Sequence, residues 1–445
     1  NSFDADPGPG VYNLGVTSVL ANRDIFIIKL DVNGNFLWAK QMSSPAGAPN
    51  DDVATIKLDS SGNIYLAGSY TYVDFDPGAG DQTLMASGSS GAFIVKLDNN
   101  GNFLWVKTLE GTSNKKIIDL ELDGSENIYV AGRFQGNIDL NPDSTMQDLR
   151  VTAGNFDTFV AKYDSNGNYI WGLNYGGTAS DTPEKILING NDLYVGGAFT
   201  GTVDLDPTSG VSNVVSAGGQ DAYLTKLTLN GDYVSSFVIP GTTSNLDSIR
   251  DIYVDTTGNI YLSGLFQNIT LNSNNYTANV ANADAFYLKL DSSLNFSSIY
   301  LIQGDGIQSI PFIQQLADNK FLAIGSSRGV AIFNYANPIS TEGNSIPQSY
   351  TYVTKFDFET TLDTNNFESE NNFSVYPNPV QSVLNIVSQN KIVSINIYNL
   401  EGRKVFGQAK SEITNVNLEI LQTGTYILQM QDENGKIENR KLIKY

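Results

Sequence analysis

The side chains in this chain that are best suited to chemistry are closely spaced carboxylates. Asp74 and Asp76 stand in the stretch Val-Asp-Phe-Asp-Pro-Gly, and Asp204 and Asp206 stand in Val-Asp-Leu-Asp-Pro-Thr. Carboxylate oxygens at short spacing are ligands that Ca²⁺ prefers, so both pairs are candidate calcium sites. Aspartates before a proline also form Asx-turns, which need no ion. Neither reading is excluded by the sequence.

Two residue types that dominate catalysis and metal binding are missing. The sequence has no histidine and no cysteine, which removes the commonest general base, thiolate zinc sites and disulfides. Paired carboxylates could still hydrolyse glycosides, but acids that recur along a chain are better explained as turn formers. The sequence therefore predicts no enzyme, no catalytic or cofactor-binding residues, and no metal beyond the two calcium candidates.

The acids belong to a repeat. A lysine, an Asp-x-x-Gly-Asn turn and a tryptophan recur together in Lys29–Lys40, Lys96–Lys107 and, with leucine as the last residue, Lys162–Leu173. The first lysine recurs at steps of 63 to 67 residues, at Lys29, Lys96, Lys162, Lys226, Lys289 and Lys355. The stretch Gly-Asn-Ile-Tyr-Leu-Ala-Gly and the Val-Asp-Phe-Asp-Pro-Gly element recur with the same period. A fixed period of this kind indicates an array of similar structural units.

Each unit is expected to contain strands and no helix. Ala92–Asp98 and Asn102–Leu109 are short, rich in aromatic and β-branched residues, and bounded by turn residues. Asp98 and Gly101 suit a type I turn with a glycine bulge. Two such hairpins in about 65 residues make a propeller blade with one long loop. The tryptophan of each motif is expected to fill the gap between neighbouring blades.

The predicted fold class is all-β, a β-propeller of about six or more four-stranded blades followed by a small C-terminal β-sandwich. Blades are expected to begin near residues 50, 117, 182, 247 and 307. The first blade is incomplete, and the last has no clear fourth strand. Either the first hairpin completes the last blade and gives six, or further blades lie upstream of this sequence.

The repeat resembles a known bacterial family. The stretches Asp284–Phe296, Asp157–Asp181 and Asp59–Gly68 are similar to the bacterial β-propeller repeat often called the SBBP repeat. The resemblance covers approximately residues 1–357. It implies a propeller scaffold without fixed catalytic residues.

The composition changes near the C-terminus. Residues 372–445 carry a net charge of +2, whereas the rest of the chain carries −23. Residues 359–371 are polar and acidic without periodicity, which predicts a linker. Alternating apolar residues in Val393–Tyr398 and Tyr426–Gln431 predict a small sandwich. The expected domains are therefore a propeller over residues 1–358, the linker, and a sandwich over residues 372–445.

The C-terminal segment resembles the type A C-terminal sorting domain of the Bacteroidetes type IX secretion system. The residues that carry the resemblance are Tyr376, Pro377, Asn378, Pro379, Leu384, Asn385, Gly402, Arg403, Lys404, Gly424, Tyr426, Lys441 and Lys444. The resemblance implies export through the periplasm and the outer membrane, with the translocon and the downstream sortase or attachment machinery as partners. It also implies a secreted or cell-surface protein. The alternative is a generic sandwich that binds carbohydrate or protein.

The net charge of −21 disfavours nucleic acid as a partner, and no apolar run approaches the length that spans a bilayer. We therefore expect a secreted or surface-displayed propeller that binds a glycan or protein ligand or acts in adhesion. The alternatives are a secreted carbohydrate-active enzyme, such as a propeller glycosidase or lyase, and a structural surface-layer component.

Overall fold

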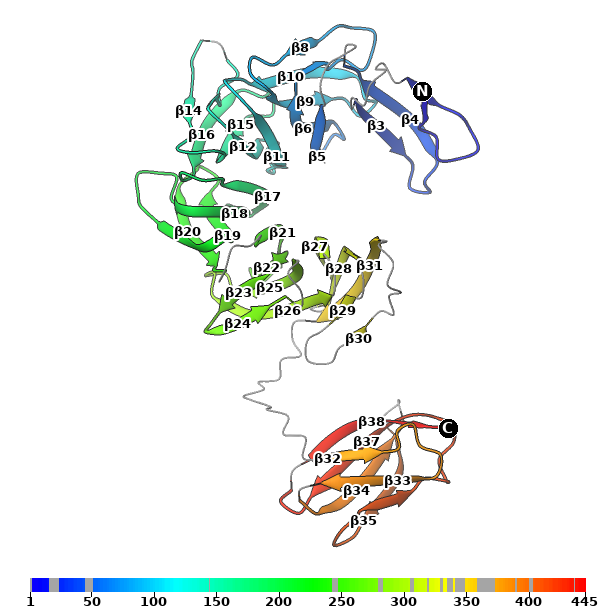
Figure 1. Cartoon of the computed structure of the whole chain (residues 1–445). Helices are drawn as coiled ribbons and strands as arrows, with labels where there is room; N and C mark the ends of the chain where they lie inside the picture. Colours follow the sequence, from blue (N-terminus) through cyan, green and yellow to red (C-terminus); the bar gives the residue numbers. More distant parts are fainter. Residues whose placement is uncertain are drawn as a thin grey trace. The chain divides into compact units, whose positions relative to one another are not determined.

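The computed structural model describes residues 2–15, 24–44, 51–143, 145–241, 247–278, 283–304, 308–317, 320–328, 331–333, 339–340, 349–357, 373–388, 390–399, 403–435 and 437–445. The chain forms two compact units, Asn1–Thr360 and Thr361–Tyr445. Every regular element of the described residues is a β-strand (Figure 1). The linker expected at residues 359–371 lies outside the described residues.

The first unit repeats one antiparallel plan (Figure 1). Blade 1 consists of β5 (Asp52–Leu58), β6 (Ile64–Tyr70), β9 (Gly91–Leu97) and β10 (Phe103–Leu109). Blade 2 consists of β11 (Lys115–Leu122), β12 (Ile128–Phe134), β15 (Asp157–Tyr163) and β16 (Tyr169–Tyr175). Blade 3 consists of β17 (Thr182–Asn189), β18 (Asp192–Asp204), β19 (Asn213–Thr228) and β20 (Tyr233–Ile239). Each sheet therefore has four strands paired in sequence order.

Blade 4 continues the plan with two additions. It consists of β21 (Ser248–Val254), β22 (Ile260–Phe266), β25 (Asp284–Leu290) and β26 (Phe296–Gly304), and β29 (Ala331–Phe333) and β30 (Ile339–Ser340) extend its sheet beyond β26. Blade 5 has three strands, β27 (Gln308–Ala317), β28 (Lys320–Arg328) and β31 (Ser349–Asp357). The first strands of the five blades begin within two residues of the predicted positions.

The N-terminal hairpin consists of β3 (Ile25–Leu30) and β4 (Phe36–Met42), which pair only with each other among the described residues. Lys29 in β3 and Lys355 in β31 occupy the same repeat position, so both strands are third strands of a blade. Blade 5 has no fourth strand among the described residues, whereas the hairpin supplies a third and a fourth. No pairing joins the hairpin to blade 5 in the part of the chain that is described.

The long loop of each repeat forms a two-stranded ribbon. Three ribbons are separate sheets that follow the second strand of a blade, namely β7 (Tyr72–Asp74) with β8 (Thr83–Met85), β13 (Asn137–Asp139) with β14 (Leu149–Val151), and β23 (Asn268–Leu271) with β24 (Asn274–Thr277). At the N-terminus β1 (Ser2–Asp4) pairs with β2 (Asn13–Gly15). In blade 3 the ribbon is the continuous extension of β18 and β19.

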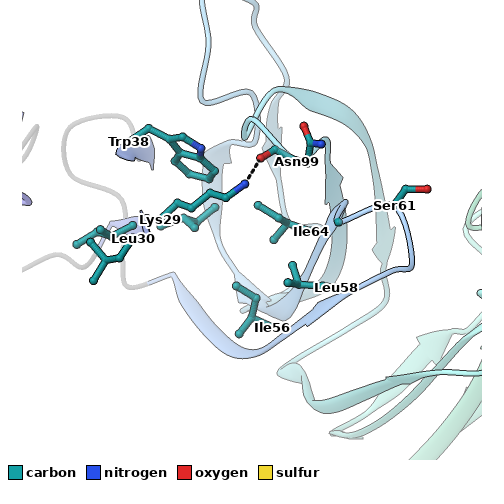
Figure 2. A pocket seen from close by; sticks show the side chains of 11 residues that line it. Lys29, Leu30, Trp38, Ile56, Leu58, Ser61, Ile64 and Asn99 are labelled. Atoms are coloured by element: carbon teal, nitrogen blue, oxygen red, sulfur yellow. Dashed lines mark hydrogen bonds between the residues drawn. The ribbon is translucent and has the colours of Figure 1, made fainter. Parts of the chain in front are cut away.

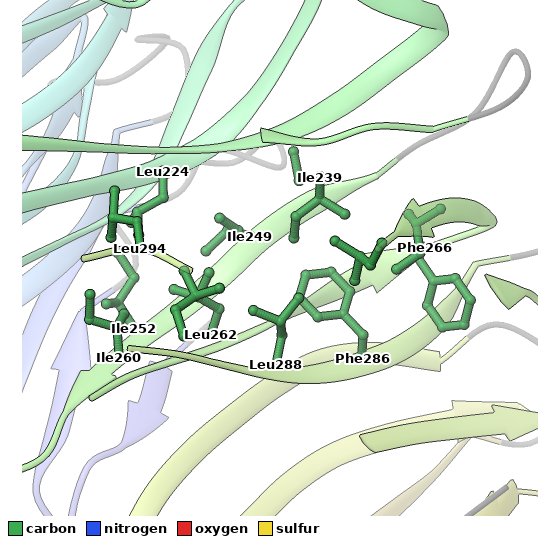
Figure 3. Close-up of a cluster of buried hydrophobic side chains, with 14 of the residues drawn as sticks. Leu224, Ile239, Ile249, Ile252, Ile260, Leu262, Phe266, Phe286, Leu288 and Leu294 are labelled. Carbon is green, nitrogen blue, oxygen red and sulfur yellow. The ribbon is translucent and has the colours of Figure 1, made fainter. Parts of the chain in front are cut away.

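The cores lie between blades. Figure 3 shows aliphatic side chains of blade 3, such as Leu224 and Ile239, packed on Ile249, Leu262 and Phe286 of blade 4. All five are fully buried. Alternating side chains point to opposite faces of a strand, so a blade that is apolar on both faces buries them only between two neighbours. The apolar strands therefore require the stacked arrangement.

The hairpin turns have the predicted structure. Asp98 Oδ1 accepts hydrogen bonds from the backbone N–H groups of Asn100 (2.8 Å) and Asn102 (2.9 Å), and Gly101 has a φ of 78°. Glycine is favoured at such a positive φ because it has no Cβ. Similar carboxylate-centred turns are built on Asp31, Asp59, Asp123, Asp164, Asp255 and Asp291. Turn formation therefore explains the recurring acids of this motif.

The C-terminal unit contains two sheets. One consists of β32 (Phe373–Tyr376), β33 (Val383–Ser388) and β36 (Asn415–Asn417), and the other of β35 (Lys404–Ala409), β34 (Ile392–Tyr398), β37 (Gly424–Asp432) and β38 (Ile437–Lys444). Leu384 of the first sheet and Ile395 and Leu428 of the second belong to one fully buried cluster. This is the packing of a small sandwich. No helix long and apolar enough to cross a bilayer occurs among the described residues of the chain.

Candidate functional site

The first strands of blades 1 to 5 form a row, in which each strand contacts the first strand of the next blade. We call β5, β11, β17, β21 and β27 the first-strand row. Each is the edge strand of its own sheet, and Figure 1 shows them gathered on the same side of the blades. Side chains of this row therefore meet side chains from neighbouring blades.

Ion pairs span the junctions of the first-strand row. Between blades 1 and 2, Lys57 Nζ lies 2.5 Å from Glu121 Oε1, and Lys116 pairs with Asp52. Between blades 2 and 3, Lys185 Nζ lies 2.8 Å from Asp119 Oδ2. Between blades 3 and 4, Arg250 Nη1 lies 2.9 Å from Glu184 Oε2. Each of these junctions is thus held by opposite charges as well as by apolar packing.

One register position of the row carries a connected polar network. Strand pairing makes Thr55, Asp119, Lys185 and Asp251 equivalent in blades 1 to 4. Thr55 Oγ1 donates to Asp119 Oδ1 at 2.9 Å, and the backbone N–H of Ile186 donates to Asp119 Oδ2 at 3.2 Å. Asp251 Oδ2 accepts from the N–H of Ile313 in blade 5 at 3.2 Å. Hydrogen bonds and an ion pair thus join blades 1 to 3 at this position, a further hydrogen bond joins blades 4 and 5, and Lys185 and Asp251 interact electrostatically between the two groups.

Partial burial and ion pairing shift the pKa values of the charged side chains in the first-strand row. Burial raises the pKa of Glu121, opposed by Lys57, and burial raises the pKa of Glu184, opposed by Arg250 and Arg133. Burial lowers the pKa of Lys185. The neighbouring carboxylates, above all Asp119, raise it by more, so the pKa is raised overall. Each charge is thus stabilised by a partner one blade away. A surface of fixed, paired charges can bind a polar ligand through several blades at once.

The tryptophans lie between blades, as predicted. The Trp105 ring meets Tyr65 edge-on at 6.1 Å, and Trp171 meets Tyr129 at 6.2 Å. Trp171 Nε1 also donates to the carbonyl of Leu229 in the next blade at 3.4 Å. The rings are half-buried. Their role is therefore structural packing at the blade edges.

The two calcium candidates have turn geometry. Asp74 Oδ1 accepts from the N–H groups of Asp76 (3.0 Å) and Gln82 (2.9 Å), and Asp76 Oδ1 accepts from Gly78 N (2.7 Å). Asp204 and Asp206 make the equivalent bonds to Asp206 N, Ser212 N and Thr208 N. No group of three or more acidic side chains that could hold a metal ion occurs among the described residues. Asx-turns therefore account for both pairs.

An apolar groove of about 460 Å³ lies between the N-terminal hairpin and blade 1 (Figure 2). Lys29 Nζ crosses it and donates to the carbonyl of Asn99 at 2.7 Å. Ile56 and Leu58 line it and are 53% and 63% exposed. The side chains at the register position of Ile56 are 0 to 4% exposed in the other blades, namely Leu120, Ile186, Ile252 and Ile313. In those blades the second strand of the preceding blade covers this position, and no described strand does so at Ile56.

The sorting motif gathers around the last strand of the C-terminal unit. Asn378 Nδ2 donates to the carbonyl of Lys441 at 2.7 Å, and the N–H of Ile443 donates to Asn378 Oδ1 at 2.9 Å. Val380 bridges to Lys444 in parallel, and its N–H donates to the carbonyl of Ile443 at 2.8 Å. The peptide bonds before Pro377 and Pro379 are cis. The Tyr-Pro-Asn-Pro loop is therefore fixed against β38.

The other motif residues are placed separately. Leu384 is in the core, Asn385 Nδ2 donates to the carbonyl of Tyr376 at 3.2 Å, and Tyr426 Oη donates to the carbonyl of Gln422 at 2.8 Å. Arg403 closes a turn with Asn399, Lys404 begins β35 and Gly424 begins β37. Gly402 lies outside the described residues. Lys441 is exposed and Lys444 is 8% exposed, so Lys441 is the one available to a partner.

The first unit is thus an all-β array of four-stranded antiparallel blades, and the second is a small sandwich with a motif-bearing loop. Residues 374–445 match the family model described as the secretion system C-terminal sorting domain. The chain therefore carries a type IX secretion sorting domain, as the sequence indicated, and is a cargo of that system that is exported to the cell surface or secreted. Its sorting domain interacts with the type IX machinery.

Two curated relatives resemble parts of the chain. An uncharacterized WD repeat-containing protein of Acanthamoeba polyphaga mimivirus is 26% identical over 248 residues, 49% of this chain. The regulatory protein FlaEY of Caulobacter vibrioides is 29% identical over 175 residues, 38% of this chain. The match covers 17% of the length of either relative.

Two solved structures also match. The extracellular domain of a one-component system of B. thetaiotaomicron aligns over 90% of this chain and 82% of its own, with 11% identity and a TM-score of 0.17. Dimeric latent PorU of Porphyromonas gingivalis aligns over 88% of this chain and 32% of its own, with 10% identity and a TM-score of 0.14. Scores this low carry no argument about fold or function.

Sequence reasoning missed the ion pairs of the first-strand row, although a signal was present. Lys57 and Glu121 are 64 residues apart, and Asp119 and Lys185 are 66 apart. Both separations match the repeat period. Opposite charges one period apart in the first strand would have predicted ion pairs across blade junctions.

Proposed function

We propose that residues 1–358 form a β-propeller that serves as a binding or adhesion module of a secreted protein. The observation that carries this proposal is the chemistry of the first-strand row. The Asp-x-x-Gly-Asn turns and blade cores recur because the fold needs them, whereas one position of the row reads Thr55, Asp119, Lys185 and Asp251 in successive blades. Charges that differ between repeats are not required by the repeat pattern, and the partly exposed ones among them, such as Lys185, can serve recognition.

The ligand that suits this surface is polar and extended, either a glycan chain or a protein segment. The paired charges of the row alternate in sign from blade to blade, which favours a ligand that carries both donors and acceptors over a polyanion. The net charge of −23 over residues 1–371 also opposes polyanions. The ligand class is tested by binding the purified full chain to arrays of bacterial and host glycans.

A matched pair of variants makes this test specific. Lys185→Met removes a charge of the first-strand row, whereas Lys226→Met removes a charge that pairs with Asp192 inside blade 3 at 2.8 Å. Loss of array binding in the first variant alone supports the proposal. Equal binding by both variants and the wild type would place recognition elsewhere on the chain.

The second candidate is carbohydrate hydrolysis. Asp119 and Glu121 are two carboxylates on one face of β11, and burial raises the pKa of Glu121, as glycosidases require of a general acid. We propose the non-catalytic role because both carboxylates are engaged by lysines. Release of reducing sugar from array glycans, abolished by Glu121→Gln, would reverse this choice. A purely structural surface-layer role predicts neither binding nor hydrolysis.

We further propose that the blades form a closed ring of six or more. Stacked blades that bury both faces between neighbours support this proposal, as does the uncovered position at Ile56. Class averages of the purified chain by electron microscopy would count the blades. An open array of five would contradict the ring.

A further inference from the structure

Acidic residues gather at the junctions between blades. One position of the third strand, such as Asp157 or Asp221, lies close to a position at or just before the first strand of the next blade, such as Asp181 or Asp247. The third-strand residues are Asp24, Gly91, Asp157 and Asp221, and the corresponding residues of the next blade are Asp51, Lys115, Asp181 and Asp247. Three of these four junctions thus hold two aspartates, and the junction of Gly91 and Lys115 holds none.

At the junction of blades 3 and 4, one buried carboxylate oxygen has no donor among the described residues. Asp221 and Asp247 are each 1% exposed. Asp221 Oδ2 accepts from Ala217 N at 3.1 Å, and Asp247 Oδ1 accepts from Gln267 N at 2.7 Å. Asp221 Oδ1 has no hydrogen-bond partner in the described part of the chain. Burial raises the pKa of Asp221, opposed by the backbone N–H groups of Ala217 and Gly241.

The two remaining oxygens converge beside Gly241. A Cβ on Gly241 would lie 2.7 Å from both Asp221 Oδ1 and Asp247 Oδ2, and 3.5 Å from the carbonyl oxygen of Asn268. Gly241 is held in place by its bridge to Ile269 and by the hydrogen bond from Thr270 N to the carbonyl of Pro240, 2.9 Å long. Asp221 Oδ1, Asp247 Oδ2 and the carbonyl oxygen of Asn268 therefore lie close to one another on the side of Gly241 that carries no side chain.

The junction of Gly91 and Lys115, which has no aspartates, shows how a positive charge balances a group of buried oxygens. Lys115 stands at the position of Asp247 and is 1% exposed. Its Nζ donates to the carbonyls of Thr112 (2.9 Å), Ser113 (3.1 Å) and Ser90 (3.3 Å). Here the chain supplies a positive charge to a buried cage of oxygens. At the junction of Asp221 and Asp247 the oxygens are present and no side-chain cation is among their partners.

We propose that Asp221 and Asp247 bind a divalent cation of the calcium class beside Gly241. Two buried carboxylates balance its charge, and Ca²⁺ completes its shell with carbonyl oxygens and waters, so a third acid is not needed. The donor set contains only oxygen, which disfavours zinc. This site is distinct from the Asx-turn pairs of the long loops, and the proposal is independent of what the first-strand row binds.

The test is a calcium titration of the full chain after removal of metal with EDTA, followed by calorimetry and by thermal melting. The wild type should bind one Ca²⁺ at this site and melt at a higher temperature with Ca²⁺ than with EDTA. Asp221→Asn and Asp247→Asn should each lower the affinity at least about tenfold. Gly241→Ala should also weaken binding, because its Cβ enters the oxygen cage.

The control is Asp181→Asn at the junction of blades 2 and 3. Both oxygens of Asp181 are already occupied, by Gly177 N at 2.6 Å and Thr200 N at 3.1 Å, so this variant should keep the wild-type affinity within about twofold. Absence of any calcium response in the wild type would overturn the proposal. So would equal affinity in wild type and Asp221→Asn. Greater stability of Asp221→Asn at every calcium concentration would also overturn it, because it would show that the two carboxylates share a proton.

Discussion

Trp105 of blade 1 lies against Gly167 in the hairpin turn of blade 2, where a Cβ would stand 3.3 Å from Trp105 Cη2. Trp38 lies in the same way against Gly101, at 2.9 Å from the Cβ position. The tryptophan of one blade therefore needs the glycine of the next blade's turn. This contact explains why the two residue types recur together in the sequence.

Gly101→Ala should destabilise the blades by about 2–3 kcal/mol, from the positive φ and from displacement of Trp38. All three tryptophans of the chain belong to the first unit, so unfolding followed by tryptophan fluorescence reports on the blades. The control is Gly34→Ala, which shares a positive φ of 82° but has no atom within 4 Å of the Cβ position. It should cost about 1 kcal/mol. Equal losses in the two variants would show that the tryptophan contact contributes nothing.

Trp105→Ala should cost about 2–3 kcal/mol, which is below the usual loss for a fully buried aromatic ring because the side chain is half-buried. Trp105→Phe should cost less, since it keeps the contact with Tyr65. Urea unfolding followed by circular dichroism measures both. A loss below about 0.5 kcal/mol for the alanine variant would identify the ring as a solvent-facing platform.

The pair of Lys185 and Asp119 should show a coupling energy of about 1–2 kcal/mol in a double-mutant cycle with Lys185→Met and Asp119→Asn. The pair is partly buried, so the coupling should persist at high salt. The more exposed pair of Arg250 and Glu184 is the control, since salt should weaken it more strongly. Strict additivity of the two single variants would show that the blades do not interact through this pair.

Stability should depend on Asp181 between about pH 4 and pH 7. Burial raises the pKa of Asp181 from 3.8 to about 6. The folded state therefore binds this proton more tightly than the unfolded state, and the favourable contribution present below about pH 4 is lost as the pH rises through 6. The loss amounts to roughly 3 kcal/mol.

The measurement is the free energy of unfolding at pH 4 and pH 7 for the wild type and Asp181→Asn. The asparagine variant lacks the titration, so its stability relative to the wild type should rise across this range. Parallel pH profiles would show that Asp181 keeps an ordinary pKa in the folded protein.

Asn378→Ala should weaken the sorting domain, because it removes both side-chain hydrogen bonds that fix the Tyr-Pro-Asn-Pro loop to β38. We expect a loss of about 1–3 kcal/mol in the C-terminal unit and a lower secreted fraction in a type IX-competent bacterium. Asn417→Ala, on an exposed strand end, is the control. Normal secretion of a destabilised Asn378→Ala protein would show that the loop is not read by the machinery.

Fusing residues 359–445 to a periplasmic fluorescent protein should carry that protein out of the cell, since the C-terminal unit is compact by itself. Deleting the same residues from this chain should leave the blades in the periplasm. Fractionation and immunoblotting measure both. A fusion that stays periplasmic would show that export needs the blades as well.

Much of the fold could be predicted because its determinants are local. The turn at Asp98 and Gly101 is specified by residues within one hairpin, and its recurrence set the blade boundaries. The sorting motif could likewise be recognised, because its residues follow one another in order within one segment of the sequence. The partners of Asp119 and the cage at Gly241 could not be predicted, because they depend on which side chains of different blades meet. The choice between calcium and Asx-turns at Asp74 and Asp76 shows the same limit, since only the structure reveals that backbone N–H groups donate to Oδ1 of both aspartates.

Among the described residues, the edge of β3 that faces away from β4 has no partner strand, and it lies beside the exposed Ile56 and Leu58. An unpaired strand edge next to an aliphatic surface is a template on which other chains can add strands, and soluble proteins usually protect such edges with charge. Here the ammonium group of Lys29 points across the groove and donates to the carbonyl of Asn99. It therefore places no charge at the strand edge. Self-association of concentrated solutions should therefore begin at this end of the array, and a lysine in place of Ile56 would be the natural gatekeeper.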